Sequence, residues 1–455
     1  MQRLLISAAH KSSGKTTLTI GLCAALTQRG LVVQPFKKGP DYIDPMWLGR
    51  ASKGACYNLD FYTMTREEIS EKFLHYAQHA DISLIEGNKG LYDGLDLDGS
   101  NSNAALANLL ETPVVLVIDA QGMTRGIAPL ILGYQAFEQN INIAGVILNQ
   151  VRGQRHESKL RAVIEHYTDV PVMGAVAHNP DMAITERHLG LIPSNEQAQA
   201  EQHIDRIARL VNEQVDIENL LAISSNVTTL KEKRSHESRS AVSPKLRIGI
   251  ARDESFGFYY PDDLEQLEKL GADLIDIDML NERELPDIDG LFIGGGFPES
   301  RMQQLSANQS MRESLRTAIE GGLPVYAECG GLMYLTRSIR WQDQVYPMVG
   351  VIPADTVMHQ RPQGRGYTRL QATTEHPWPA VTDAGFGAHE FHYSSLEGLP
   401  ENTHYAYKVL RGTGIDGQHD GIVYNNLLAC YAHLRHTRQS PWAEQFFAFI
   451  RSRTS

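Results

Sequence analysis

The sequence predicts an α/β protein of two domains, and three observations support this. The chain has 455 residues, more than one ordinary hydrophobic core accommodates. Short apolar strands alternate with amphipathic helices over residues 1–225, and the alternation restarts at residue 245. Between them, residues 226–244 (NVTTLKEKRSHESRSAVSP) are polar and have no apolar face, as in a linker. We therefore expect domains over 1–225 and 245–455, joined by a linker over 226–244.

Ten segments, nine strands and one helix, show the apolar patterns on which this fold class rests. In the first domain the apolar runs are typical of the buried strands of a parallel sheet, and one amphipathic stretch, residues 16–30, predicts a helix that ends at Gly30. The expected strands of the first domain are 3–9, 31–36, 82–87, 113–120 and 143–151. Those of the second domain are 245–253, 272–278, 290–296 and, leading into a turn, 323–331.

Composition narrows the classes of function. A formal net charge of -12 argues against nucleic acid as a partner. No apolar run approaches the ~20 residues of a membrane helix, so no membrane partner is expected. The N-terminus, MQRLLISAAHKSS, leads directly into a candidate phosphate loop that a cleaved signal peptide would remove, so we expect a cytoplasmic protein. Cys23, Cys56, Cys329 and Cys430 form no CxxC pair, which argues against zinc sites and disulfides.

The segment SAAHKSSGKTT (7–17) lies between an expected buried strand and an expected helix, where a phosphate-binding loop belongs. Backbone N–H groups there hold phosphate oxygens, Lys15 can reach the β- and γ-phosphates, and the Thr16 hydroxyl can ligate Mg²⁺. Gly14 is the only glycine in this loop, and a plain strand-to-helix turn is the alternative interpretation. We predict a site for ATP and Mg²⁺ formed by Gly14, Lys15, Thr16 and Thr17.

An acidic residue at a strand end strengthens the nucleotide prediction. Glu86 closes the expected strand ISLIEG and is placed to hold Mg²⁺ or its water. The alternative is a strand-end carboxylate that only faces solvent. The presence of Lys15 and Thr16 favours the metal-binding role over this alternative. The predicted metal ligands are Thr16, Asp44 and Glu86.

The segment QPFKKGPDYIDP (34–45) follows a strand and therefore lies at the carboxyl edge of the sheet, where ligands of open α/β folds bind. Lys37 or Lys38 could stabilise a transferring phosphoryl group, and we choose Lys37 as the catalytic candidate. Asp41 or Asp44 could complete the metal shell or orient substrate, and we assign Asp41 and Tyr42 to substrate. A solvated, charge-rich turn is the alternative.

The second domain contains a candidate nucleophile. LPVYAECGGLMYL places Cys329 just past a buried strand, with two glycines and an apolar helix beyond. Such a sharp strand-to-helix turn exposes a thiol to the helix N-terminus, which is expected to lower the pKa of Cys329. A single cysteine is more often a small core residue, so the prediction depends on what accompanies it.

Two further stretches supply possible partners for this thiol. GLFIGGGFPES puts Gly294, Gly295 and Gly296 at another strand end, and we predict that the N–H groups of Gly295 and Gly296 form an oxyanion hole. ACYAHLRH puts His433 after a strand-like run, as the candidate general base. A turn cysteine, oxyanion glycines and a late histidine together favour nucleophilic catalysis over a structural role.

Taken together, the motifs resemble a known family. The N-terminal half resembles the dethiobiotin-synthetase-like ATPase domain, a P-loop parallel sheet, and the C-terminal half resembles a class I glutamine amidotransferase domain of the cobyric-acid-synthase type. With the two halves in this order, the chain resembles cobyrinic acid a,c-diamide synthases over nearly its whole length. The segments that carry this resemblance are GPDYIDP, LIEGNKGLYDG, AGVILNQV, ERHLGLIP and GAHEFHYS. The resemblance implies a carbon–nitrogen ligase that uses ATP and glutamine to amidate tetrapyrrole carboxylates through an acyl phosphate.

By this resemblance, Cys329 attacks the side-chain amide of glutamine, releases ammonia and leaves a glutamyl thioester for water, with His433 as base. The acid of the usual amidotransferase triad lies two residues beyond the histidine, where this chain has Arg435, so a Cys–His dyad is expected. The ammonia would have to reach the ATP site without meeting bulk water, where it would be protonated.

The expected partners are glutamine and a tetrapyrrole, and the chain could form a homodimer. Within HQRPQGRGYTRL (359–370), Arg365 could clamp tetrapyrrole carboxylates together with Arg361 and Arg369, and a solvated loop is equally compatible. Cobyrinic acid is the ring that the family implies; sirohydrochlorin or sirohaem, and a non-tetrapyrrole acid, are alternatives. A partitioning-type P-loop ATPase is a different class of alternative, although His10 stands where its signature lysine belongs and Lys11 is one place off.

Overall fold

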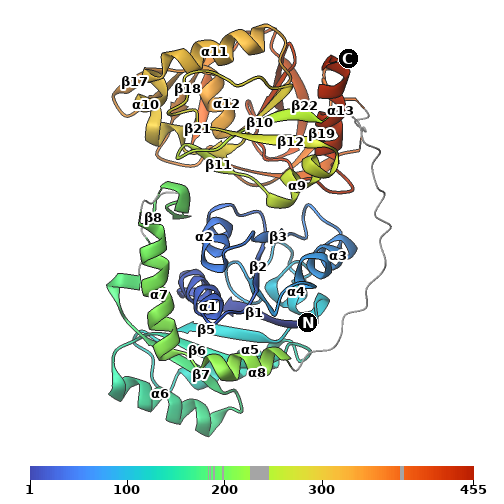
Figure 1. The fold of residues 1–455 in the computed structure, drawn as a ribbon. Helices are drawn as coiled ribbons and strands as arrows, with labels where there is room; N and C mark the ends of the chain where they lie inside the picture. Colours follow the sequence, from blue (N-terminus) through green and yellow to red (C-terminus); the bar gives the residue numbers. More distant parts are fainter. Residues whose placement is uncertain are drawn as a thin grey trace. The chain divides into compact units, whose positions relative to one another are not determined.

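The computed structural model describes residues 1–455 except 183, 185, 188, 189, 197, 198, 226–244, 380–383 and 455. The chain divides into two compact units, Met1–Ser235 and His236–Ser455 (Figure 1). The linker predicted over 226–244 lies outside the described residues, and so do two positions of the ERHLGLIP motif, 188 and 189.

The first unit contains a seven-stranded sheet in the order β3-β2-β4-β1-β5-β6-β7, and all of its strand pairs are parallel. Its strands have nearly continuous apolar sequences because helices cover both faces of the sheet. The bounds are β1 (Gln2–Ala8), β2 (Val33–Lys38), β3 (Tyr57–Leu59), β4 (Ile82–Glu86), β5 (Val114–Asp119), β6 (Ile143–Val151) and β7 (Val172–Ala177). A short hairpin of β8 (Glu186–Arg187) and β9 (Gly190–Leu191) lies outside this sheet.

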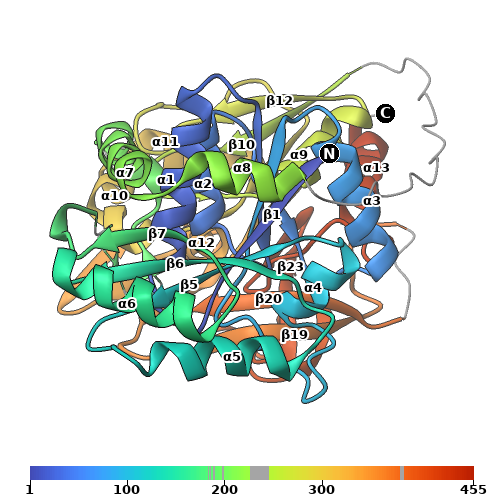
Figure 2. The same cartoon turned by 90° about the horizontal axis from the view of Figure 1, so that it is seen from below.

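Figure 2 shows α5 and α6 on one face of this sheet and α1, α7 and α8 on the other. Apolar residues of α3 to α6 join one core cluster with the strands, whereas α1 packs against α7. A Cβ on Gly21 of α1 would lie 2.5 Å from Val211 Cγ2 of α7, so the glycine permits this close approach. The bounds are α1 (Lys15–Gln28), α2 (Ile43–Ser52), α3 (Arg66–Ala77), α4 (Asn103–Leu109), α5 (Ile127–Phe137), α6 (Gln154–Tyr167), α7 (Ala200–Gln214) and α8 (Ile217–Ser225).

The strand order reverses around β1, which pairs with β4 on one side and β5 on the other. In open α/β sheets such a reversal leaves a crevice at the carboxyl ends of the strands, where ligands bind. The loop after β1, the segment after β2 and the end of β4 all lie at that edge, as the sequence predicts. The sequence analysis did not identify β3 and β7, and β3 has only three residues.

The second unit contains a nine-stranded sheet in the order β12-β10-β13-β15-β24-β23-β22-β19-β20. The strands from β12 to β24 in that order pair in parallel, and those beyond β24 pair antiparallel. The bounds are β10 (Leu246–Ala251), β12 (Ala272–Ile277), β13 (Gly290–Ile293), β15 (Val325–Glu328), β19 (Gly364–Ala372), β20 (Phe386–His392), β22 (His404–Arg411), β23 (His419–Tyr424) and β24 (Leu427–Cys430).

Two smaller sheets complete this unit. One pairs β11 (Phe256–Phe258) with β14 (Gly295–Gly296), and the other has the order β17-β16-β18-β21. The strands of the latter are β16 (Thr336–Trp341), β17 (Gln344–Pro347), β18 (Ile352–Met358) and β21 (Ser394–Glu397). The sequence analysis did not identify the strands from β16 to β23.

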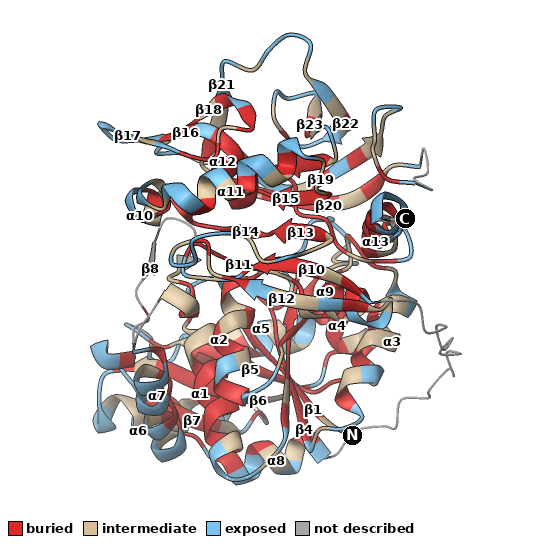
Figure 3. Cartoon of the chain, turned by 45° about the horizontal axis from the view of Figure 1, so that its top comes forward, coloured by how far each residue is buried: buried red, intermediate tan, exposed pale blue. Residues whose placement is uncertain are grey.

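Helices pack on both faces of the nine-stranded sheet. Its central strands β13, β15 and β24 are buried, whereas β12 and β22 are partly exposed (Figure 3). Apolar residues of α9 and α13 belong to one core cluster, and those of α10, α11 and α12 belong to another. The bounds are α9 (Pro261–Lys269), α10 (Met302–Ala307), α11 (Gln309–Glu320), α12 (Gly330–Leu335) and α13 (Trp442–Thr454). In the part of the chain that the structure describes, every helix is too short or too polar to cross a bilayer.

Candidate functional site

The loop between β1 and α1 depends on its one glycine. Gly14 is the N-cap of α1 and has a φ of 85°, in the left-handed region. A Cβ at this position would lie 2.1 Å from Asn149 Nδ2, which donates a hydrogen bond of 2.9 Å to the Ser13 carbonyl. Asn149 comes from the end of β6 and braces the loop, a role that the sequence analysis missed. Both the backbone angle and this close approach therefore require glycine at position 14.

Three predicted site residues converge on one oxygen of Glu86, at the end of β4. Glu86 Oε1 accepts hydrogen bonds from Lys15 Nζ at 2.7 Å, Thr16 Oγ1 at 2.6 Å and Lys37 Nζ at 3.0 Å. The carboxylate is fully buried, and Glu86 Oε2 accepts no hydrogen bond from the described residues. Residues from three separate segments thus meet at the carboxyl edge of the sheet, with one buried oxygen left unpaired.

The segment after β2 contributes two carboxylates to the same cluster. Lys37 Nζ forms a short hydrogen bond to Asp44 Oδ2 and lies 3.8 Å from Asp41 Oδ2. Thr16 Oγ1 donates to Asp44 Oδ2 at 3.4 Å. Asp41 Oδ1 in turn accepts from the backbone N–H groups of Ile43 and Asp44, which fixes the first turn of α2. Lys37 therefore holds three carboxylates together.

Burial and charge set the protonation states in this cluster. Burial alone would raise the pKa of Glu86, but the Lys15 and Lys37 ammonium groups hold that pKa well below its usual value. Burial would lower the pKa of Lys37, but the Asp44 and Glu86 carboxylates raise it. Burial and the Asp44 charge raise the pKa of Asp41. Lys38 differs from Lys37, because burial lowers its pKa to about 8 despite the attraction of Asp60.

The remaining predicted residues of this unit lie close to the cluster. Tyr42 is buried directly before α2, and Thr17 is half-buried in the first turn of α1. Lys38 Nζ donates to Asn88 Oδ1 at 3.3 Å and does not contact Glu86. Among the described residues, no three His, Cys, Asp or Glu side chains are arranged to hold a metal by themselves. A cation here would therefore need the Thr16 hydroxyl and oxygens from a bound nucleotide.

In the second unit, Cys329 forms a strained turn between β15 and α12. Its φ of 45° and ψ of -99° are unusual for a residue with a side chain. Its backbone N–H donates to the Cys430 carbonyl at 2.7 Å, which ties the turn to the end of β24. The predicted strand-to-helix geometry is thus present.

Glycines let the backbone close around this turn. A Cβ on Gly330 would lie 2.9 Å from the Gly296 carbonyl oxygen and 3.0 Å from the Gly296 nitrogen. A Cβ on Gly295 would lie 2.5 Å from His433 Cε1. Gly295, Gly296, Cys329 and His433, all predicted from the sequence, therefore belong to one site.

His433 has an acidic neighbour that the sequence analysis missed. His433 Nδ1 lies 3.3 Å from Glu328 Oε2, and both side chains are at most 3% exposed. The sequence contained a signal for this residue, because Glu328 is an acid directly before the nucleophile in YAECGG. Glu328 thus lies beside the histidine of the expected Cys–His dyad. Arg435, at the usual position of the acid, is paired instead with Asp262, with Nη2 and Oδ2 2.6 Å apart.

The expectation of a lowered thiol pKa is not met. Burial, with the negative charges of Glu299 and Glu328, raises the pKa of Cys329, although a hydrogen bond from the Gly330 N–H opposes the shift. The helix N-terminus is outweighed because the side chain is only 7% exposed. Deprotonation of this thiol therefore needs a base beside it.

Arg365, predicted to bind substrate, belongs to the second unit, whereas Asp41 and Tyr42 belong to the first. It is exposed on β19, and its guanidinium lies 5.3 Å above the Phe391 ring. Cys329 Sγ lies 4.0 Å from the carbonyl oxygen of Phe391, so the thiol and Arg365 both contact this residue, one at its backbone and the other at its ring.

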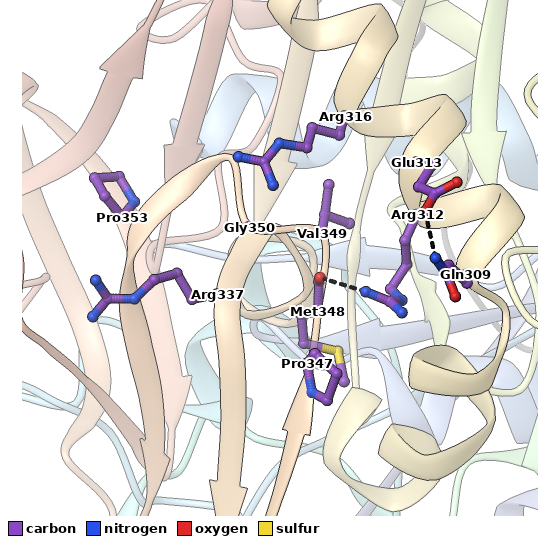
Figure 4. Close-up of a pocket in the computed structure, with 10 residues that line it drawn as sticks. All are labelled: Gln309, Arg312, Glu313, Arg316, Arg337, Pro347, Met348, Val349, Gly350 and Pro353. Carbon is purple, nitrogen blue, oxygen red and sulfur yellow. Dashed lines mark hydrogen bonds between the residues drawn. The ribbon is translucent and has the colours of Figure 1, made fainter.

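The second unit also has a pocket of about 500 Å³ that includes none of the predicted site residues (Figure 4). Its three arginines already have partners: Arg312 donates to the Met348 carbonyl at 3.0 Å, Arg316 pairs with Glu320 and Arg337 with Asp355. We assign no ligand to it. The lining residues are Gln309, Arg312, Glu313, Arg316, Arg337, Pro347, Met348, Val349, Gly350 and Pro353.

Each of the two units matches a known domain family. Residues 5–192 match the CobQ/CobB/MinD/ParA nucleotide binding domain, and residues 247–441 match the CobB/CobQ-like glutamine amidotransferase domain. A cobyrinate a,c-diamide synthase of Magnetococcus marinus is 44% identical over 100% of this chain and 98% of its own length. The enzymes of the same name from Methanosarcina acetivorans and Listeria monocytogenes are 42% and 39% identical, each over 95% of this chain and over 92% and 96% of their own lengths.

Proposed function

Because this chain belongs to the cobyrinate a,c-diamide synthase family, its reaction is the glutamine-dependent amidation of cobyrinate, and we propose how its two units divide that reaction. The first unit activates carboxylates with ATP, and the second releases ammonia from glutamine. The observation that carries the proposal is the convergence of Lys15, Thr16 and Lys37 on the buried Glu86. The relatives are named for cobyrinate, so sirohydrochlorin and sirohaem gain no support.

The first unit makes the carboxylate a better acyl donor. A carboxylate reacts poorly with ammonia because the group that leaves would be oxide. Attack of its oxygen on the γ-phosphorus of ATP forms an acyl phosphate and releases ADP, and ammonia then displaces phosphate. Lys15 neutralises the phosphate charge at the N-terminus of α1. Lys37, whose pKa the Asp44 and Glu86 carboxylates raise, stabilises the charge of the transferring phosphoryl group.

The cluster around Glu86 fits Mg²⁺. The unpaired, buried Glu86 Oε2 is an anionic oxygen without a hydrogen-bond donor among the described residues. The Thr16 hydroxyl contacts the other oxygen of Glu86 and the Asp44 carboxylate. These are the hard oxygen ligands that Mg²⁺ takes. The bound ion would neutralise charge on the ATP phosphates. We assign Asp41 and Tyr42, at the start of α2, to the tetrapyrrole.

The second unit hydrolyses glutamine. The Cys329 sulfur attacks the side-chain carbonyl carbon of glutamine, and His433 takes the thiol proton and gives it to the departing ammonia. Backbone N–H groups of Gly295 and Gly296 stabilise the oxyanion of the tetrahedral intermediate. Water then cleaves the glutamyl thioester and frees glutamate and the thiol.

The test separates the two units by the source of nitrogen. Cys329→Ser is expected to abolish amidation with glutamine and to retain amidation with added ammonia, because the ATP site is untouched. The amide products are counted by mass spectrometry of the corrinoid. Loss of both activities would make Cys329 a structural residue, and retention of the glutamine-dependent activity would refute its role as nucleophile.

A further inference from the structure

We propose that Glu328 is the positioning acid of the Cys329–His433 pair, in place of the acid that amidotransferase triads carry beyond the histidine. The inference rests on the proposed glutamine hydrolysis in the second unit. Glu328 is the last residue of β15 and directly precedes the nucleophile in the chain. In the parallel pairing of β15 with β24, Glu328 lies opposite Cys430, three residues before His433. Strand register therefore brings an acid from one strand to the histidine that follows the next.

The carboxylate of Glu328 is fixed by contacts at both oxygens. Oε1 accepts a hydrogen bond of 2.8 Å from the backbone N–H of Leu434 and a short one from the Tyr326 hydroxyl. Oε2 lies 3.3 Å from Nδ1 of His433. The side chain is 2% exposed. A carboxylate held in this way presents one oxygen to the imidazole and has little freedom to turn away.

The other charged groups around His433 do not supply this function. Arg435 pairs with Asp262, and its guanidinium lies 3.9 Å above the Tyr260 ring. His389 stacks on His433 with ring centroids 4.9 Å apart. Burial, together with the charges of His433 and Arg435, holds the pKa of His389 well below its usual value, so this second ring stays neutral. Of these three groups, Glu328 is the anion that faces the imidazole.

This contact decides which nitrogen of His433 is the base. When Glu328 Oε2 accepts the Nδ1 hydrogen, Nε2 carries the lone pair that can take a proton. The S–H bond of Cys329 then breaks as the Nε2–H bond forms, which leaves a thiolate beside an imidazolium. Since burial raises the pKa of Cys329, that transfer needs a carboxylate to stabilise the imidazolium.

The first test is Glu328→Gln. The side-chain oxygen of the glutamine is expected to keep the hydrogen bonds from Leu434 and Tyr326, which turns the amide N–H toward His433 Nδ1. That donor imposes the tautomer with hydrogen on Nε2, which cannot accept the thiol proton. Glutamine hydrolysis should fall by up to about 10⁴-fold, the loss that the wrong histidine tautomer causes in a catalytic triad, while ammonia-dependent amidation is retained. Unchanged hydrolysis overturns the inference.

The rate of Cys329 alkylation distinguishes a positioning role of Glu328 from a direct effect of its charge on the thiol. Glu328 and Glu299 both raise the pKa of Cys329 through their charges, so removal of either charge alone would speed alkylation of the thiol at pH 7. If Glu328 acts through His433, Glu328→Gln instead slows alkylation by iodoacetamide, because the thiolate–imidazolium pair is lost. Glu299→Gln is the matched control and should speed it. Faster alkylation in both variants overturns the inference.

A third variant covers the case in which Glu328→Gln also loses ammonia-dependent amidation. Tyr326→Phe keeps the carboxylate but removes one of the two donors to Oε1. Its glutamine hydrolysis should fall while its ammonia-dependent amidation stays, and equal rates with wild type would overturn the inference. Cys329→Ser distinguishes a failure of the proposed function from a failure of this inference. If Cys329→Ser retains glutamine-dependent activity, the proposed function is wrong. If Cys329→Ser loses that activity while Glu328→Gln retains it, only the role of Glu328 is wrong.

Discussion

Replacement of Glu86 by glutamine probes the centre of the ATP site. The change keeps the shape of the side chain and removes its charge. In the native chain one oxygen of Glu86 accepts from Lys15, Thr16 and Lys37, and the side chain is fully buried. Glu86→Gln therefore leaves Lys37, itself only 2% exposed, with less anionic compensation.

The expected loss of folding stability in Glu86→Gln depends on the ion-pair partner that Lys37 retains. Removal of one partner from a buried ion pair costs about 3–5 kcal/mol, because the other charge stays buried. Lys37 retains Asp44, so we place the loss at the lower end, about 3 kcal/mol. For a unit of this size each kcal/mol lowers the Tm by about 2–4 °C, which predicts a drop of roughly 6–12 °C in the first unit.

The pH dependence gives a second signature. The pKa of Glu86 is lowered on folding, so its contribution is fully present above the ordinary value of 4.5 and is lost as the pH falls toward the lowered pKa. The difference in stability between wild type and Glu86→Gln should therefore be largest near pH 7. It should shrink below about pH 4.5.

The assay is thermal unfolding of the full chain from pH 3 to pH 8, with Mg²⁺-dependent amidation measured in parallel. The matched control is Ser83→Ala, on the same strand, since Ser83 is fully buried and its hydroxyl has no hydrogen-bond partner among the described residues. The control should change stability little. Half-maximal activity of Glu86→Gln should need about 10- to 100-fold more Mg²⁺. A variant as stable and as active as wild type at pH 7 would refute the reasoning.

Three further substitutions test the rest of this site. Lys15→Ala should stop amidation with glutamine and with ammonia alike, because both need the acyl phosphate; activity in either assay would remove the phosphate loop from the account. Gly14→Ala should cost about 1–2 kcal/mol from the left-handed backbone and weaken ATP binding in calorimetry by displacing Asn149; wild-type affinity would contradict the loop geometry. Asp44→Asn should raise the Mg²⁺ requirement less than Glu86→Gln, because Asp44 is 16% exposed and its contact with Thr16 is longer; an equal or larger rise would reverse the assigned order of the ligands.

The sequence predicted the parts of both sites that depend on local order. Gly14, Lys15 and Thr16 follow from a strand, a loop and a helix in succession, and Glu86 and Lys37 follow from strand ends that share one edge of a parallel sheet. Cys329 with the two glycines after it, and the glycines at 294–296, were found in the same way. In each case the residue and its signal lie within a few positions of each other.

Contacts between distant segments could not be predicted in this way. Asn149 braces a loop 136 residues earlier, which depends on the neighbour relation of β6 and the central strands. Glu328 reaches His433, 105 residues later, only because β15 pairs with β24. The thiol pKa was misjudged because burial, unlike the helix turn, is set by the packing of the whole unit. The antiparallel strands β19 to β23 lacked a clear apolar alternation.

Product analysis by mass spectrometry tests the central claim most directly. The full chain is incubated with ATP, Mg²⁺ and glutamine, with cobyrinate in one reaction and sirohydrochlorin in another. Each amidation replaces a carboxyl hydroxyl with an amino group, so the mass shift counts the amides formed. The account predicts the diamide of cobyrinate, formed only with ATP, and no amide of sirohydrochlorin. Amidated sirohydrochlorin with unchanged cobyrinate, or amidation without ATP, would contradict it.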